Sequence, residues 1–145
     1  MTGAAVFQPG EGQTLDLGPN RWFTKRGAEG SEVVVGEIEL AADGDLPPLH
    51  SHKTINEAFY VLEGEVELTD GKQTWRAGPG TAMDIPTGVL HGIKKVLSGK
   101  PRMLIIHTPA KPALALLEAL SEAFRAGDPQ KMGEILSKVD IKLAD

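Results

Sequence analysis

The feature that most limits what this chain can fold into is a succession of short apolar runs, cut by turn-forming residues. From Val6 to about His107, segments rich in Val, Ile, Leu and Phe are separated by Gly, Pro, Asp and Asn. Many short strands at such spacing are typical of all-β proteins, and they predict a sandwich or barrel. We expect strands in SEVVVGEIELAA, EAFYVLEGEVELTD, KQTWRA, TAMDIP, VLHGIKKV and PRMLIIHT.

The last third of the chain changes to helical spacing. Leu114, Leu117, Leu120 and Phe124 recur three or four residues apart, with Pro112 as a start signal and Gly127 as a stop signal. A second helix is predicted from Asp128-Pro129, with the apolar residues Met132, Ile135, Leu136 and Val139. Neither helix carries an obvious catalytic group. We therefore expect residues 1–110 to form the β-barrel and residues 111–145 to pack as helices on the barrel or on a dimer partner.

Composition excludes several classes of function. The 145 residues suit one domain, and a net charge of -5 with scattered basic residues argues against a nucleic-acid partner. The chain has no cysteine, so disulfides, thiolate metal sites and a cysteine nucleophile are excluded. No segment approaches the roughly 20 apolar residues of a membrane helix, and the N-terminus lacks the pattern of a secretory signal. We expect a cytoplasmic protein with no membrane or nucleic-acid partner.

The segment HSHKTINE places potential metal ligands close together. His50 and His52 are two residues apart, so on a strand both imidazoles point to one face, and a short loop could return Glu57 to the same place. His91 follows about forty residues later, after a predicted hairpin that could bring it beside them. The sequence therefore predicts a metal site of three nitrogens and one carboxylate oxygen.

These residues resemble the two motifs of the cupin superfamily. The first motif, Gly, five residues, His-x-His, four residues, Glu, six residues and Gly, is met by Gly44, His50, His52, Glu57 and Gly64. The second is met by Gly80, Pro86, Gly88 and His91, with Lys95 in place of a final Asn. That departure affects a turn contact and leaves the ligands intact. The resemblance covers roughly residues 31–109 and is greatest to small bacterial single-domain cupins of the quercetinase-like type.

The resemblance implies an antiparallel jelly-roll β-barrel with a C-terminal helical tail and one metal ion inside. His50, His52, Glu57 and His91 would be its ligands, and the chain would form a homodimer. Three nitrogens and one oxygen suit Fe, Mn, Ni, Co, Cu or Zn, and they leave positions open for substrate and O2 or water.

Residues that alternate with or pair near these ligands are candidates for a substrate pocket. We expect the following side chains to line it: Phe59, Val61, Met83, Ile85, Met103 and Ile105. An apolar lining suits an aromatic or otherwise hydrophobic substrate, although core packing explains the same residues. His107, on the same strand face as Ile105, is a candidate acid or base or a structural histidine. Glu57 is the other candidate catalytic group.

Three functions stay open at this point. The leading one is a metal-dependent dioxygenase acting on a small apolar or aromatic enol, phenol or diketone. The second is a non-redox isomerase, cyclase or lyase in which Glu57 or His107 moves a proton. The third is a metal-containing protein that binds a small molecule without turnover. The fold cannot choose among them, because one barrel supports many chemistries.

Overall fold

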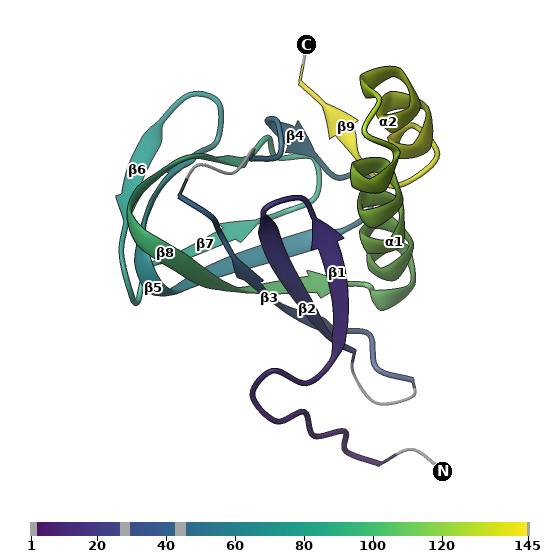
Figure 1. The fold of residues 1–145 in the computed structure, drawn as a ribbon, viewed down its shortest axis with the longest axis horizontal. Helices are drawn as coiled ribbons and strands as arrows, with labels where there is room; N and C mark the ends of the chain where they lie inside the picture. Colours follow the sequence, from purple (N-terminus) through teal and green to yellow (C-terminus); the bar gives the residue numbers. More distant parts are fainter. Residues whose placement is uncertain (1–2, 27–29, 43–45, 145) are drawn as a thin grey trace.

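The computed structural model describes residues 3–26, 30–42 and 46–144, and it shows a curved sheet beside two helices (Figure 1). Gly44 of the first motif lies outside these residues. In chain order the elements are β1 (Gln13–Leu17), β2 (Asn20–Arg26), β3 (Val34–Glu39), β4 (His50–Ser51), β5 (Asn56–Thr69), β6 (Thr74–Ala77), β7 (Ala82–Ile85), β8 (Gly92–Thr108), α1 (Ala110–Ala126), α2 (Pro129–Leu136) and β9 (Lys142–Leu143).

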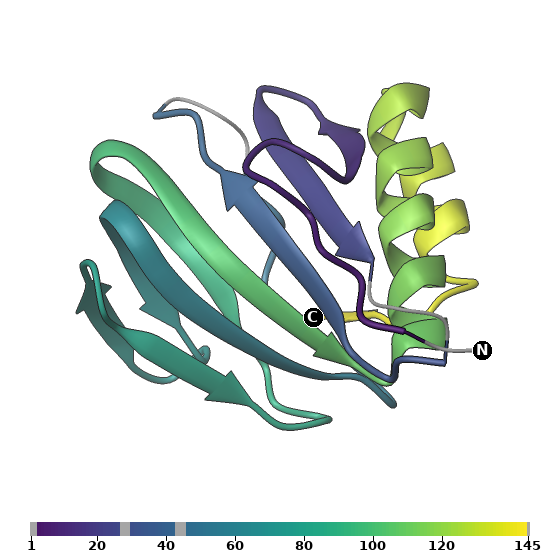
Figure 2. The same cartoon turned by 90° about the horizontal axis from the view of Figure 1, so that it is seen from below.

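Seven of the strands in the described residues form one antiparallel sheet. The order is β1-β2-β3-β8-β5-β6, and β7 also pairs with β5. The sheet curls around its inner face, as Figure 2 shows, and the register of β5 against β8 is broken at several irregularities. Such irregularities bend and twist a strand. The predicted all-β antiparallel fold with a C-terminal helical tail is confirmed.

The long strand β8 replaces two strands that the sequence predicts. VLHGIKKV and PRMLIIHT are predicted as two separate strands, but Gly92–Thr108 is continuous. Gly99 has a φ of 71° and faces Gly64, whose φ is 73°, so the chain bends here without leaving the sheet. A Cβ atom on Gly64 would lie 2.7 Å from Cα of Pro101. The two glycines therefore let β5 and β8 pass closely at the irregularities in their register.

The hairpin of β1 and β2 is a further element that the pattern of the sequence does not predict. β1 buries Leu15 and Leu17, whereas β2 buries Asn20, Trp22 and Thr24, two of which are polar, so the apolar alternation is short. The Trp22 indole donates from Nε1 to Oγ1 of Thr24 at 2.7 Å. It also lies over Gly36 of β3, where a Cβ atom would be 2.8 Å from Cε2 of the indole and nearer still to Cζ2.

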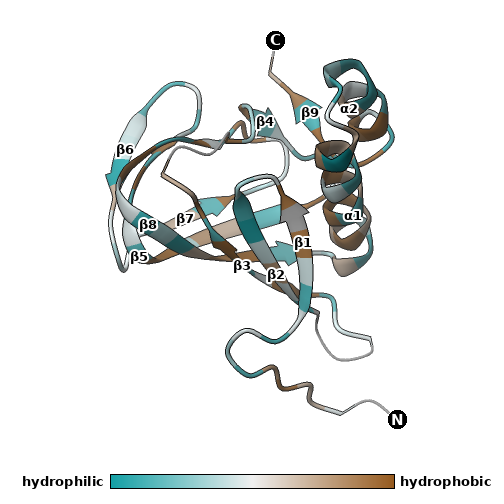
Figure 3. Cartoon of the chain, viewed as in Figure 1, coloured by the Kyte–Doolittle hydropathy of each residue, from teal (hydrophilic) through white to brown (hydrophobic). Residues whose placement is uncertain are grey.

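At one end of the molecule α1 packs against the sheet, and α2 packs against α1 (Figure 1). α1 begins at Ala110, two residues before the predicted start, and ends at Gly127 with a φ of 67°. Asp128 caps α2 by accepting from the amides of Gln130 and Lys131. Figure 3 shows apolar and polar bands on both helices, and α1 buries Leu116 and Leu117 in the same core as the strands.

None of the helices in the described residues is long and apolar enough to cross a membrane. The division of the chain at residue 110 stays a prediction.

Candidate metal centre

The structure brings the four predicted ligands together. His50 lies in β4, His52 directly follows that strand, Glu57 is in β5 and His91 directly precedes β8. One nitrogen or oxygen atom from each side chain lies within 4.8 Å of the corresponding atoms of the other three. His50 is partly buried and the other three are buried. A single ion could therefore contact all four.

Backbone pairing explains why these side chains meet. The amide of His50 donates to the carbonyl of His91 at 3.2 Å, and the amide of His91 donates to the carbonyl of His50 at 2.9 Å. Their imidazole centroids lie 4.5 Å apart. The amide of Gly88, in the turn before His91, donates to the carbonyl of His52 at 2.8 Å. The second motif is thus hydrogen-bonded to the first at both histidines.

Each of the three imidazoles uses Nδ1 to contact a backbone carbonyl. The Nδ1 atom of His50 lies 2.7 Å from the oxygen of Pro48, that of His52 lies 2.8 Å from the oxygen of Asp140, and that of His91 lies 2.9 Å from the oxygen of Val89. A carbonyl only accepts, so Nδ1 carries the proton in each case. The lone pair is then on Nε2, and this arrangement is typical of histidines that bind metals.

The Glu57 carboxylate lies at the centre of the cluster. Its Oε2 atom is 2.9 Å from Nε2 of His52 and 2.9 Å from Nε2 of His91, and its Oε1 atom is 3.2 Å from Nε2 of His107. A neutral imidazole has one N–H, but His52 and His91 each have a carbonyl oxygen at Nδ1 and the Glu57 Oε2 atom at Nε2, and both oxygens are acceptors. With the proton on Nδ1, the Nε2 lone pair faces the lone pairs of the carboxylate. A cation between Nε2 and the carboxylate removes this repulsion.

A transition-metal ion fits that position. Two ligand atoms that are each about 2.1 Å from one ion, at right angles to each other, lie about 3 Å apart. The distances of 2.9 Å from Glu57 Oε2 to the two Nε2 atoms agree with this spacing. Three imidazole nitrogens and one carboxylate oxygen form a donor set that suits Fe, Mn, Co, Ni, Cu or Zn. The residues present therefore fit a bound metal.

The local electrostatics favour the cation-binding form of Glu57 and His50. Burial raises the pKa of Glu57, but hydrogen bonds with His107, His52 and His91 outweigh it and hold that pKa well below its usual range. Burial lowers the pKa of His50 to about 4, so this imidazole is neutral near pH 7. Burial also lowers the pKa of His52, but its hydrogen bonds to Glu57 and to the Asp140 carbonyl outweigh it and raise that pKa. An ionised carboxylate beside a neutral imidazole is the form that binds metal.

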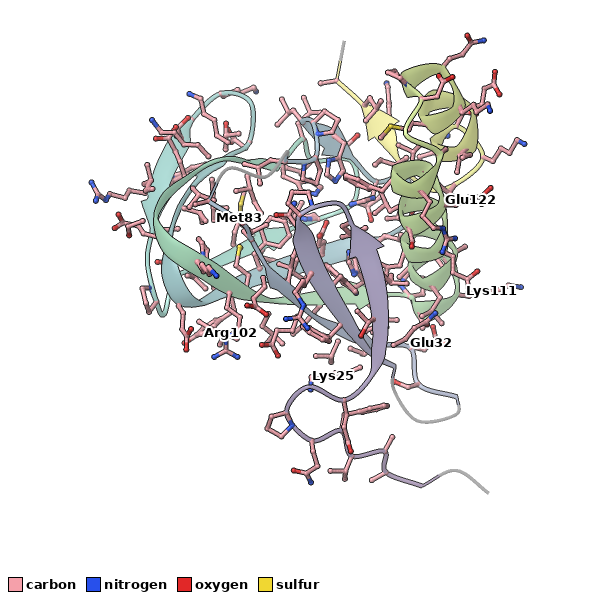
Figure 4. The ribbon with its side chains drawn as sticks, viewed as in Figure 1. Lys25, Glu32, Met83, Arg102, Lys111 and Glu122 are labelled. Carbon is pink, nitrogen blue, oxygen red and sulfur yellow. The ribbon has the colours of Figure 1, made fainter. Side chains whose placement is uncertain are left out.

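A cavity of about 230 Å³ lies between the ligand cluster and the helices. Trp22, Ile38 and Ile105 contribute from the sheet, whereas Leu116, Leu120 and Phe124 contribute from α1. His50, His52, Glu57 and His107 are the ionisable groups among the described lining residues, and none of those residues is Lys or Arg. The charged side chains Lys111 and Glu122 of α1 point outward instead (Figure 4). The cavity thus has polar groups at one end and apolar walls elsewhere.

The predicted pocket residues divide into two groups. Phe59 and Ile105 line the cavity together with His107. Val61, Met83, Ile85 and Met103 do not line it: three are fully buried in the core, and Met83 packs against that core. Val61 and Met103 lie on the inward face, but they pair with each other farther along β5 and β8 from Glu57. Strand alternation indicates which side chains lie on the inward face of the sheet, but it does not indicate how far the cavity extends along that face.

His107 lies beside the cluster and is only 3% exposed. Its Nε2 atom contacts Oε1 of Glu57, and its ring centroid is 6.0 Å from that of Trp22. Its Nδ1 atom is buried and has no hydrogen-bond partner among the residues that the structure describes. Buried polar atoms of this kind are rare, and one in a cavity wall suggests an absent ligand or water. His107 thus contacts Oε1 of Glu57 through Nε2, and its Nδ1 atom is available to a ligand in the cavity.

Two contributions to the site come from the C-terminal segment and were not predicted as site residues. The apolar stripe of α1 indicates only that the helix covers the barrel, but Leu120 and Phe124 also form a wall of the cavity. Asp140 accepts at its carbonyl from His52, and nothing in the local pattern SKVDIKLAD indicates this contact.

Comparisons with known proteins agree with this arrangement. The model of the cupin domain family matches residues 29–107, and the chain therefore belongs to the cupin family. KdgF from Halomonas sp. is 19% identical with a TM-score of 0.65, over 76% of this chain and 97% of that one. An RmlC-like cupin from Shewanella frigidimarina is 19% identical with a TM-score of 0.62, over 77% and 97% of the two chains. These two likenesses concern the fold.

A third similar structure is the polyketide cyclase RemF from Streptomyces resistomycificus. It is 25% identical to this chain with a TM-score of 0.52, over 76% of this chain and 75% of that one. No curated protein matches the chain.

Proposed function

We propose that this protein is a metal-dependent dioxygenase that acts on a small, uncharged enol, phenol or diketone. One observation carries the proposal: the ligand cluster borders a cavity whose described lining contains no Lys or Arg. Phosphates and carboxylates are usually held by such cationic side chains, so an apolar substrate with one polar end fits better. The cavity of about 230 Å³ is smaller than the about 300–1,000 Å³ usual for drug-sized ligands, which favours a small molecule.

The ligands His50, His52, Glu57 and His91 would hold one divalent metal, whose Lewis acidity makes a bound enol or phenol more acidic. The protein's own side chains perform the remaining tasks. His107 fixes one oxygen of Glu57, so the carboxylate presents Oε2 to the cluster. The apolar walls exclude water from the site, which strengthens electrostatic interactions there. The free Nδ1 of His107 is available for a hydrogen bond with the substrate.

A non-redox isomerase, cyclase or lyase is the second candidate. The observation that favours it is His107, a buried imidazole in the cavity wall with an unpaired Nδ1 atom that could exchange a proton with a substrate. The similarity to a polyketide cyclase agrees with this chemistry.

Metal content is the first measurement that tests the proposal. We expect one equivalent of a transition metal in protein purified without added metal or chelator, and its loss in His50→Ala. Elemental mass spectrometry measures both. No metal as purified and none after reconstitution would refute a metal-dependent function and leave a small-molecule binding protein, with neither metal nor turnover, as the remaining interpretation.

Oxygen uptake then separates the two enzymatic candidates. An oxygen electrode with flavonols, catechols and diketones should show consumption by the protein loaded with Fe, Mn, Ni, Co or Cu. Turnover by the zinc form under argon would support the non-redox candidate instead. The homodimer and the cytoplasmic location stay predictions, and sedimentation would test the first of these.

A further inference from the structure

We propose that Asp140 is a positioning residue of the metal centre, which ties the C-terminal segment to the loop between two ligands. The proposal rests on the proposed metal site. It assigns a role at that site to residues outside the segment 29–107 that matches the cupin family. The partner of Asp140 is the turn between His52 and Glu57.

The carboxylate of Asp140 accepts hydrogen bonds from three consecutive backbone amides of that turn and from one hydroxyl. Oδ1 accepts from the amide of Lys53, Oδ2 accepts from the amide of Ile55 at 2.9 Å, and the amide of Thr54 contacts both oxygens at 3.1 and 2.9 Å. The hydroxyl of Thr54 also donates to Oδ2 at 2.8 Å. One side chain therefore sets the path of the chain between two metal ligands.

The backbone of the same residue orients the imidazole of His52. Its carbonyl oxygen lies 2.8 Å from Nδ1, which places the proton on that nitrogen and leaves the Nε2 lone pair for the metal. A shift of Asp140 would release both the turn and the tautomer of His52. The carboxylate therefore fixes the turn that follows His52, and the carbonyl fixes the orientation of the His52 imidazole.

Strand β9 extends this connection to a second ligand. Leu143 is opposite His50 and Lys142 is opposite Ser51 in the two-stranded sheet of β4 and β9. The amide of Ala144 donates to the carbonyl of Leu49 at 2.9 Å. Apart from the bridge to His91, β9 is the pairing partner of β4 in the described part of the chain. The segment 140–144 thus holds both histidines of the first motif.

A purely structural role is the alternative, because a carboxylate that caps a turn also stabilises the fold. Asp128 offers a matched control. It lies in the same C-terminal segment and also accepts from two backbone amides, those of Gln130 and Lys131, but it caps α2 and contacts no ligand. A substitution there lowers stability through the helix alone. The comparison of the two residues separates ligand positioning from general stabilisation.

The test uses full-length Asp140→Ala, Asp140→Asn and Asp128→Ala. The dissociation constant for Co(II) is measured by competition with a chelator, and the visible absorption spectrum of the Co(II) form is recorded. We expect Asp140→Ala to bind Co(II) about 10–100-fold more weakly with an altered spectrum, because residues that orient metal ligands have effects of this size. Asp140→Asn keeps one acceptor oxygen and should fall between Asp140→Ala and the unchanged protein. Asp128→Ala should keep both the affinity and the spectrum.

A metal-free measurement keeps this inference separate from the proposed function. Imidazole NMR of the metal-free protein should show a proton on Nδ1 of His52 that is hydrogen-bonded to the Asp140 carbonyl, and Asp140→Ala should disturb this signal while Asp128→Ala does not. If the unchanged protein binds no Co(II), the proposed function fails and the NMR comparison decides the present proposal. An Asp140→Ala protein with unchanged affinity, spectrum and tautomer would overturn it. Should that variant not fold, the same measurements on Asp140→Asn decide.

Discussion

The close contact between Gly36 and Trp22 leads to a prediction about the packing of a cavity wall, because Trp22 lines the cavity. In Gly36→Ala the new Cβ atom would lie 2.8 Å from Cε2 of the Trp22 indole, whereas carbon atoms pack about 3.5–4.0 Å apart. The φ of Gly36 is not positive, so the added atom meets only this steric obstacle. The indole must retreat by more than about 1 Å because Cζ2 is nearer still, and it is 4% exposed, hydrogen-bonded to Thr24 and next to His107.

Overpacking of this kind costs about 1–3 kcal/mol. For a chain of this size that lowers Tm by about 3–10 °C. The assay is thermal and urea unfolding of Gly36→Ala, with intrinsic fluorescence recorded in a Trp75→Phe background, because Trp22 is then the only tryptophan. We expect a shifted emission spectrum as well as the loss of stability.

A double-mutant cycle with Trp22→Phe tests the reasoning behind this value. The smaller ring lacks the atoms that the new Cβ would meet, so Gly36→Ala should cost much less in that background. Trp22→Phe itself should be destabilising, because the buried hydroxyl of Thr24 loses the indole N–H. If Gly36→Ala costs the same free energy of unfolding in both backgrounds, contact with the indole is not the cause and the argument is wrong.

Three further predictions concern the fold and the metal. Gly64→Ala should lower stability by several kcal/mol more than Gly80→Ala in urea unfolding, because both have positive φ but only the first would meet Pro101; equal losses would contradict the steric argument. Free metal at about 100 times its dissociation constant should add about 2.7 kcal/mol, roughly 10 °C in Tm, and His91→Ala should abolish this gain; a gain retained in the variant would contradict the ligand assignment. Leu116→Ala should cost about 2–5 kcal/mol because the side chain is buried between helix and cavity; a loss below 1 kcal/mol in thermal unfolding, about the size of a surface change, would show that α1 is not anchored there.

The ligand set was predictable because its geometry is mostly local. His50 and His52 are one strand step apart, and Glu57 follows after a short turn, so their approach depends on few intervening residues. His91 is more distant, and its place follows from the spacing of the second motif. The structure adds the backbone bridge between His50 and His91, which explains why that spacing works.

Other features depend on contacts that a local pattern does not contain. The residues around Gly99 have the composition of a turn, but the bend is absorbed within β8 because Gly64 lies opposite. The β1–β2 hairpin places the polar residues Asn20 and Thr24 at buried positions, so its apolar alternation is short. Val61 and Met103 share the inward face with Phe59, but the limit of the cavity depends on how far α1 reaches over the sheet. Each of these outcomes is decided by a partner from a distant part of the chain.

The C-terminal segment shows that contacts between distant parts of the chain also shape the candidate site. The four proposed metal ligands all lie within the residues that match the cupin family, whereas Leu116, Leu120 and Phe124 of the cavity wall lie beyond them. A change in α1 would therefore alter which substrate fits without removing a ligand. Asp140, 88 residues from His52, has the opposite role, because it contacts a ligand and its turn. Under the two proposals, substrate selection and metal-site geometry both depend on a segment whose sequence, considered alone, indicates only two amphipathic helices and a short polar tail.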